Sequence, residues 1–150
     1  MNRRLVSVVT GTYQRHDLLL GAIENVRAQT YRPLEHVIVA DGPDDDLPGL
    51  IYETDHRHEA ETVHAYAGND ADYVPIRFAE LGFHSSSVLR DSMSAAPFMV
   101  AQLLARGEYQ MWLADDERML VPDHIETLVS LLEQYDADFA YPKVRMWWEG

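Results

Sequence analysis

The sequence contains no cysteine, which excludes disulfides, thiol nucleophiles and cysteine-ligated metal sites. Its absence fits a reducing compartment, and we expect a cytoplasmic protein. No apolar run approaches the ~20 residues that a membrane-spanning helix needs. The basic start, Met1 to Arg4, leads into a short strand pattern that polar residues soon interrupt, so we interpret it as the entry to a strand and not as a signal peptide.

Basic residues are also scarce. Lysine and arginine number 12 and aspartate and glutamate 25 in 150 residues, which gives a formal net charge of −13. Such a chain has no basic field to offset phosphate repulsion, so the composition weighs against binding to nucleic acid or to an anionic membrane surface. The hydrophobic fraction of 47% is ordinary for a folded protein. The length predicts one domain, residues 1–150, with a sizeable core.

Glycine-rich phosphate loops are missing. A dinucleotide fold would show Gly-x-Gly-x-x-Gly after the first strand, and a P-loop would show Gly-x-x-x-x-Gly-Lys-Ser/Thr. The corresponding run, Gly11 to His16, reads Gly-Thr-Tyr-Gln-Arg-His. A bound diphosphate would therefore be held through a metal ion and not by a glycine cradle.

Short β-branched runs predict buried strands over residues 5–10 and 36–40. Between them, Asp17 is placed to cap a helix through about Gln29, with Leu19, Ile23 and Val26 on one face. A strand, a helix and a second strand form a βαβ unit, whose right-handed crossover implies a parallel sheet.

The last third of the chain shows equally clear patterns. A helix from Ser94 is closed by Gly107, and a strand follows over residues 109–114, with Trp112 expected in the core. The predicted architecture is therefore α/β, a mostly parallel sheet with flanking helices. The remaining predictions are a capping box of Asp123 and Glu126 that starts a helix, a strand beginning at Asp138, a short helix over 47–55, strands over 62–66 and 74–78, and a loop at 85–87.

Polar groups follow three of the predicted strands, at the sheet edge where α/β proteins bind ligands. The triplet Asp115, Asp116 and Glu117 directly follows a strand. Because like charges held about 4 Å apart repel by about 4 kcal/mol at an effective dielectric of about 20, such a loop favours a cation. Hard oxygen ligands suit Mg²⁺ or Mn²⁺. A solvated turn before a helix is the alternative interpretation.

Two further residues stand at strand ends. Asp41 ends the second strand, where an acid commonly binds a ribose hydroxyl, although Asp-Gly-Pro is also ordinary turn chemistry. Tyr13 follows the first strand and could stack on a base or simply pack.

Other constellations favour structural interpretations. The spacing of His56, His58, Glu61 and His64 could place metal ligands on one helix face, but a solvated polar stretch is favoured. Ser85 to Ser87 lack a nucleophile elbow and are interpreted as a loop. Trp147 and Trp148 could cover an interface.

Two blocks of the chain resemble the family 2 glycosyltransferases. The first combines Val6 to Arg15 (VSVVTGTYQR), Ala28 to Tyr31 (AQTY) and Val37 to Gly42 (VIVADG). The second runs from Gly107 through Leu113-Ala114-Asp115-Asp116-Glu117 to Glu126, and looks like that family's strand, DxD region and following helix. The resemblance covers roughly residues 5–130, and it implies the GT-A fold and a nucleotide-sugar donor.

The resemblance also implies roles for individual residues. Donor-nucleotide contacts would come from the loops after the strands, and a divalent cation, Mn²⁺ or Mg²⁺, would bridge the donor's phosphates. The nucleotide-binding residues would be Thr12, Tyr13, Asp41, Arg90 and Asp115, and the metal ligands would be Asp116 with Glu117. The resemblance places the catalytic base well beyond the DxD region, so we expect the acceptor-binding part to be short or missing in this chain.

Three functions are therefore compared. The first is a metal-dependent glycosyltransferase that moves a sugar from a nucleoside-diphosphate donor, with UDP expected, to an unknown saccharide, lipid or protein acceptor. The second is a nucleotide-sugar-binding module without independent activity. The third, a sugar nucleotidyltransferase, would need a glycine-rich, arginine-containing loop that Gly11 to Arg15 does not supply. We also expect the chain to self-associate as a homo-oligomer.

Overall fold

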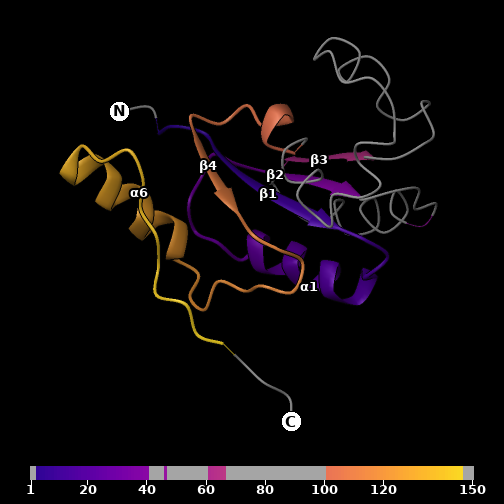
Figure 1. The fold of residues 1–150 in the computed structure, drawn as a ribbon. Helices are drawn as coiled ribbons and strands as arrows, with labels where there is room; N and C mark the ends of the chain where they lie inside the picture. The colour runs from indigo at the N-terminus through magenta and orange to yellow at the C-terminus, as the bar shows by residue number, and fades with distance from the viewer. Residues whose placement is uncertain (1–2, 41–45, 47–60, 67–100, 147–150) are drawn as a thin grey trace.

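The computed structural model describes residues 3–40, 46, 61–66 and 101–146 (Figure 1). Its four strands are all parallel and lie in the order β3-β2-β1-β4. The strands are β1 (Val6–Thr12), β2 (Leu34–Ala40), β3 (Glu61–Tyr66) and β4 (Tyr109–Trp112), and the two helices named in Figure 1 are α1 (His16–Arg27) and α6 (His124–Tyr135). The predicted α/β architecture with a parallel sheet is confirmed.

Strand β1 lies at the centre of this sheet. It pairs with β2 from Val6 opposite Leu34 to Thr12 opposite Ala40, and with β4 up to Val9 opposite Trp112. Every residue of β1 and β2 is buried, as expected of parallel strands that are covered on both faces. The uninterrupted β-branched runs seen in the sequence follow from this double burial.

Helices α1 and α6 cover one face of the sheet (Figure 1). The α1 face expected from the sequence, with Leu19, Ile23 and Val26, is buried. The cluster that joins both helices to the sheet consists of Val6, Val8, Ala22, Val26, Tyr31, Leu34, Leu113, Met119, Ile125 and Val129. Burial of these side chains, at about 1.5–3 kcal/mol for each large one, is the main stabilisation of this layer.

A buried carboxylate lies under the opposite face. Glu35 is 1% exposed and accepts hydrogen bonds from the Ser7 hydroxyl at 2.6 Å and the Arg106 backbone N–H at 2.6 Å. The Arg106 guanidinium adds an Nε bond at 2.8 Å. Burial alone would raise the pKa of Glu35, but these hydrogen bonds and the Arg106 charge outweigh it and lower the pKa.

A buried histidine stands on β2. The Thr10 hydroxyl donates to the Leu113 carbonyl at 2.8 Å and lies 2.9 Å from His36 Nε2. Since the single hydroxyl proton goes to Leu113, His36 Nε2 carries the proton of the second bond. Desolvation by burial, helped by the nearby charge of Arg27, lowers the pKa of His36 to about 3.

The expectation for Trp112 was wrong. This side chain is 56% exposed, because β4 is the outermost strand at one side of the described sheet and its burial alternates. The strand predicted from Asp138 does not form over residues 138–146. Pro142 interrupts this segment and has no N–H to donate to a neighbouring strand, while Phe139 and Tyr141 stack on one another and stay exposed.

The starts of helices α1 and α6 also differ from the predicted capping patterns. Helix α1 begins at His16 after Arg15, so Asp17 lies inside the first turn, where its charge still favours the helix dipole. Helix α6 begins after Asp123 as expected, but no side-chain capping bond forms. The Glu126 carboxylate instead accepts hydrogen bonds from Nη1 and Nη2 of Arg3, at 3.0 and 2.6 Å. A long-range ion pair therefore replaces the local capping box.

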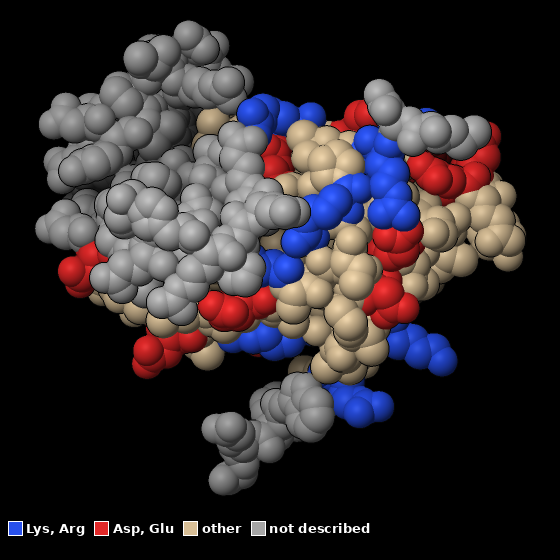
Figure 2. Space-filling view, turned by 180° about the vertical axis from the view of Figure 1, so that it is seen from behind, with Lys and Arg blue, Asp and Glu red and all other residues tan. Residues whose placement is uncertain are grey.

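Charges on the described surface are mixed. In the face seen in Figure 2, basic side chains lie directly beside acidic ones. Within the described residues no helix is long and apolar enough to cross a membrane. Strand β3 confirms the predicted strand over 62–66, and residues 101–104 are helical as expected. The elements predicted over 47–55, 74–78 and 85–87, and the start of the helix at Ser94, lie outside the described residues.

The low pKa of His36 predicts a pH-dependent stability. As the pH falls through 6.5, the unfolded chain takes up a proton at this residue and the folded chain does not. The contribution of neutral His36 to the free energy of unfolding is therefore complete above pH 6.5 and is lost progressively toward pH 3. His36→Gln keeps an N–H for Thr10 but does not titrate. The variant should lose up to about 2 kcal/mol less than the wild type between pH 6.5 and 5 in urea titrations. Parallel pH profiles of the two proteins would contradict this.

The chain at Gly107 passes so close to strands β1 and β4 that there is no space for a side chain. A Cβ built at this position would lie 2.5 Å from Ser7 Oγ, 2.6 Å from the Ser7 nitrogen and 2.7 Å from the Tyr109 carbonyl oxygen. Two of these atoms belong to the backbone of paired strands and cannot move aside cheaply. Gly107→Ala should therefore lower the free energy of unfolding by about 1–3 kcal/mol, measured by chemical denaturation. An unchanged midpoint would show that this approach is not tight.

Candidate functional site

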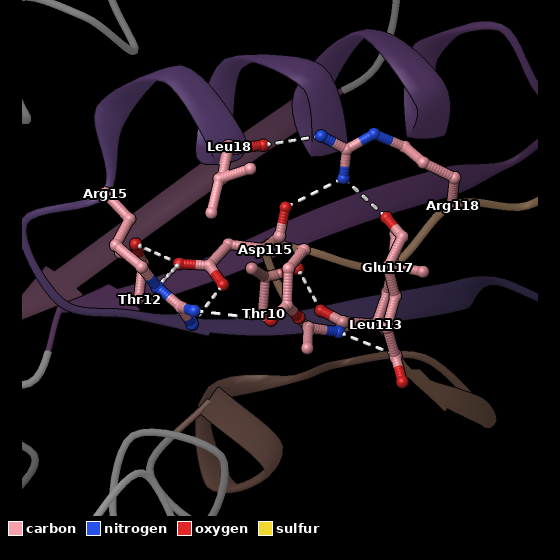
Figure 3. Close-up of polar contacts among 10 residues, drawn as sticks. Thr10, Thr12, Arg15, Leu18, Leu113, Asp115, Glu117 and Arg118 are labelled. Atoms are coloured by element: carbon pink, nitrogen blue, oxygen red, sulfur yellow. Dashed lines mark hydrogen bonds and ion pairs between the residues drawn. The ribbon is translucent and has the colours of Figure 1, made fainter. Parts of the chain in front are cut away.

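The loops that follow β1 and β4 meet at the carboxyl edge of the sheet (Figure 3). Pairing continues past the end of β4, where the Leu113 N–H donates to the Val9 carbonyl at 3.0 Å. Thr10 then anchors Leu113 through its hydroxyl. These bonds carry the chain forward beside β1, so Asp115 arrives next to Thr12 although 103 positions separate them.

The Asp115 carboxylate is the buried centre of this site. It is 0% exposed and accepts the Thr12 hydroxyl at 2.8 Å on Oδ2. Arg15 binds the same carboxylate in a fork, with Nε 3.0 Å from Oδ2 and Nη2 against Oδ1. A buried carboxylate without such partners would cost several kcal/mol, so this pairing is a condition for the loop to fold.

Arg15 reaches Asp115 through an unusual backbone turn. Gln14, between Tyr13 and Arg15, has a φ of 50°, in the left-handed region that non-glycine residues avoid. The side chain of Arg15 also extends to the second carboxylate, with Nη1 3.3 Å from Asp116 Oδ2. Asp116 is 52% exposed, so this contact is the looser of the two.

Arg118 fixes the acidic triplet to helix α1. Its Nη1 donates to the backbone carbonyls of Asp115 at 2.7 Å and Glu117 at 2.5 Å, and its Nη2 donates to the Leu18 carbonyl at 2.9 Å (Figure 3). Gly21 makes room for this crossing, because a Cβ there would collide with the guanidinium. Arg118 therefore fixes the backbone of the triplet on the side of α1, while the side chains of Asp116 and Glu117 are exposed to solvent.

Glu117 closes a tight turn of the triplet. Its carboxylate accepts the Ala114 N–H at 2.9 Å, and its own N–H donates to the Ala114 carbonyl at 3.0 Å. One carboxylate oxygen thus has a structural partner. Asp116 is the acid of the triplet whose carboxylate is the most available to a ligand.

The structure thus brings together five of the predicted site residues. Thr12 is buried at 3% exposure, and Tyr13 is 57% exposed beside it. Asp41 and Arg90 lie outside the described residues. The remaining three form the acidic triplet described above, Asp115, Asp116 and Glu117.

Two arginines of the site were not predicted from the sequence. Arg15 stands in the quoted Gly11 to Arg15 run, but its partners lie 100 or more positions away. Arg118 directly follows the triplet and acts on backbone carbonyls, which no side-chain pattern reveals. The available signals were the position of Arg118 directly after the acidic triplet and that of Arg15 in the loop after the first strand.

The donor set fits a divalent cation only in part. Among the side chains that the structure describes, no three His, Asp or Glu residues gather as a metal cage. Both oxygens of Asp115 are taken by Thr12 and Arg15, whereas the Asp116 carboxylate is half exposed. One or two carboxylates completed by water and substrate phosphates are the usual protein share of a magnesium site.

Comparison with known proteins identifies the fold. No protein-family model and no curated protein matches the sequence. A mannosyltransferase from Pyrobaculum calidifontis, solved with GDP-Man and Mn²⁺, matches 87% of this chain with a TM-score of 0.64 and 18% identity. S. aureus TarS, residues 1–349 with UDP, matches 89% with a TM-score of 0.60 and 14% identity.

These likenesses show that the chain has the α/β fold of nucleotide-diphospho-sugar transferases, the GT-A type that the sequence predicted. The chain spans about a third of each of these two structures, 33% in both cases.

Thr12→Val tests how the site is held. The substitution keeps the shape of the side chain but removes the hydroxyl that donates to a buried carboxylate. We expect a loss of about 1.5–3 kcal/mol in the free energy of unfolding, measured with urea. Thr30→Val, at an exposed hydroxyl with a 3.3 Å bond, is the control and should change stability by less than about 0.5 kcal/mol. Equal losses of stability in the two variants would show that the buried Thr12 hydrogen bond stabilises the protein no more than the exposed Thr30 bond does.

Proposed function

We propose that this chain is the donor-binding part of a metal-dependent glycosyltransferase of family 2, which transfers a sugar from a nucleoside diphosphate to an acceptor hydroxyl. The observation that carries the proposal is the joining of the Thr12 loop and the acidic triplet into one site at the carboxyl edge of a GT-A sheet. Ligands of open α/β sheets bind at this edge. The similar structures were solved with GDP-Man and Mn²⁺ or with UDP.

The nucleoside would lie across the loop that follows β1. Tyr13 is 57% exposed and offers a flat ring for stacking on a base. Asp41, the residue that follows β2, is proposed to bind the ribose or the base. Thr12 and Asp115 are expected from the sequence to contact the nucleotide themselves. Because both are buried and hydrogen-bonded to one another, we propose that their main role is to hold this surface in place.

The phosphates would face the acidic triplet. Asp116 is proposed to hold the divalent cation, Mn²⁺ or Mg²⁺, with a contribution from the free oxygen of Glu117. Such a cation supplies Lewis-acid stabilisation of the leaving nucleoside diphosphate. Arg90 is proposed as a basic residue near the diphosphate.

A binding module without independent transfer is the second candidate. Among the described residues, the site offers side chains for a nucleotide and a cation, and none of them is assigned as a base for an acceptor hydroxyl. Release of nucleoside diphosphate from a nucleotide sugar separates the two candidates. A transferase shows turnover with an acceptor, while a module binds the donor and shows none.

Asp116→Asn is the decisive variant for the metal. We expect calorimetric titration with UDP, GDP and dTDP to show binding of one nucleotide to the wild type in the presence of Mn²⁺. The variant should lose at least about tenfold in that Mn²⁺-dependent affinity, because a neutral amide is a poor ligand for a hard divalent ion. Its fold should be unchanged, since this side chain is half exposed.

Glu133→Gln provides the matched control. It removes one negative charge from an exposed position of α6 and should bind as the wild type does. Mn²⁺-dependent affinity that survives in Asp116→Asn would refute the assignment of the metal ligand. Absence of nucleotide binding by the wild type at any Mn²⁺ concentration would refute the proposed function itself.

A further inference from the structure

Arg15 occupies the space between the two carboxylates from which a metal site would be expected to form. Its Nε and Nη2 bind Asp115, and its Nη1 lies 3.3 Å from Asp116 Oδ2. One guanidinium therefore already provides positive charge to both acids. A divalent cation placed between them would meet that charge at close range.

We propose that Arg15 is a positioning residue that keeps the divalent cation off Asp115 and confines it to Asp116. This inference rests on the proposed function. A guanidinium presents its donors in a rigid fork that matches a carboxylate, and here both Asp115 oxygens are covered by that fork. With Thr12 added, Oδ2 accepts two bonds and Oδ1 one, and the side chain is 0% exposed, so Asp115 offers no solvent-facing oxygen as a ligand.

The two contacts of Arg15 differ in strength, and this difference decides which of them opens. Asp115 is buried at 0% exposure, so its ion pair with Arg15 is shielded from water. Asp116 and Arg15 are 52% and 46% exposed, and their 3.3 Å contact is solvated and weak. A cation that arrives from solvent can therefore replace Arg15 at Asp116 without disturbing Asp115.

Coupling between metal and nucleotide follows from this arrangement. With Asp115 withheld, the protein alone offers the cation few ligands and the repulsion of a nearby guanidinium. The diphosphate supplies the missing oxygens, so each of the two ligands should strengthen binding of the other by the same factor. Free Mn²⁺ without nucleotide should bind weakly to the wild type.

The experiment is titration of the nucleotide-free protein with Mn²⁺ alone, followed by the electron paramagnetic resonance signal of the free ion. Arg15→Gln removes the fork and its charge, and should bind Mn²⁺ at least about tenfold more tightly than the wild type. The double variant Arg15→Gln with Asp115→Asn should lose that gain. In Arg15→Gln, added UDP or GDP should strengthen Mn²⁺ binding less than in the wild type.

Arg32→Gln is the matched control. Arg32 has the same charge but donates to backbone carbonyls of Arg27, Gln29 and Tyr31, so its removal should leave Mn²⁺ affinity within about twofold. If Arg15→Gln does not fold by circular dichroism, Arg15→Lys replaces it. Lysine keeps the charge without the fork, and this variant must bind Mn²⁺ more tightly than the wild type.

Two results would overturn the inference. One is a folded Arg15→Gln, or Arg15→Lys in its place, that binds Mn²⁺ no more tightly than the wild type. The other is a gain that persists when Asp115 is also replaced, which would trace it to net charge alone. Failure of the proposed function is seen separately, as a wild type that binds no nucleotide. A gain of Mn²⁺ affinity that depends on Asp115 would still confirm the role of Arg15 in that case.

Discussion

The carboxylate of Asp115 is the constraint on which the site depends. It lies buried after the outermost described strand, and burial of an unpaired charge there would cost several kcal/mol. The Thr12 hydroxyl, at the end of the central strand, and the Arg15 fork, from the loop after it, provide its partners. Two loops that are remote in sequence are therefore held in one geometry, and Asp116 takes its position from the residue before it.

The opposite face of the sheet contains the same chemistry with a different result. Glu35 is also buried, and it is also paired with a hydroxyl and an arginine, those of Ser7 and Arg106. That arrangement ties chain segments together and presents no second carboxylate among its described contacts. At the carboxyl edge, by contrast, Asp116 stands exposed directly beside the buried pair. An available acid next to a fixed one distinguishes a candidate ligand site from a structural ion pair.

The sequence predicts the sheet better than the site. Continuous β-branched runs and helical periodicity are local signals, so β1, β2, α1 and α6 were placed within a few residues of their observed bounds. The acidic triplet was found because it directly follows a strand. Arg15 and Arg118 were missed because their partners depend on strand order and register, which no local pattern encodes. Trp112 was misjudged for the same reason, since only topology shows that β4 is outermost in the described sheet.

Charge balance explains how so acidic a chain could receive an anionic donor. The whole chain has a formal charge of −13, yet the site combines three carboxylates with the guanidiniums of Arg15 and Arg118, so its local charge is only −1. A divalent cation at Asp116 would reverse that sign at the place where the diphosphate is proposed to bind. Because salt screens charges beyond about 8 Å at physiological ionic strength, this local balance outweighs the distant acidic residues. The two arginines thus reduce the repulsion that the anionic donor must overcome, although Arg15 also competes with a cation for Asp116.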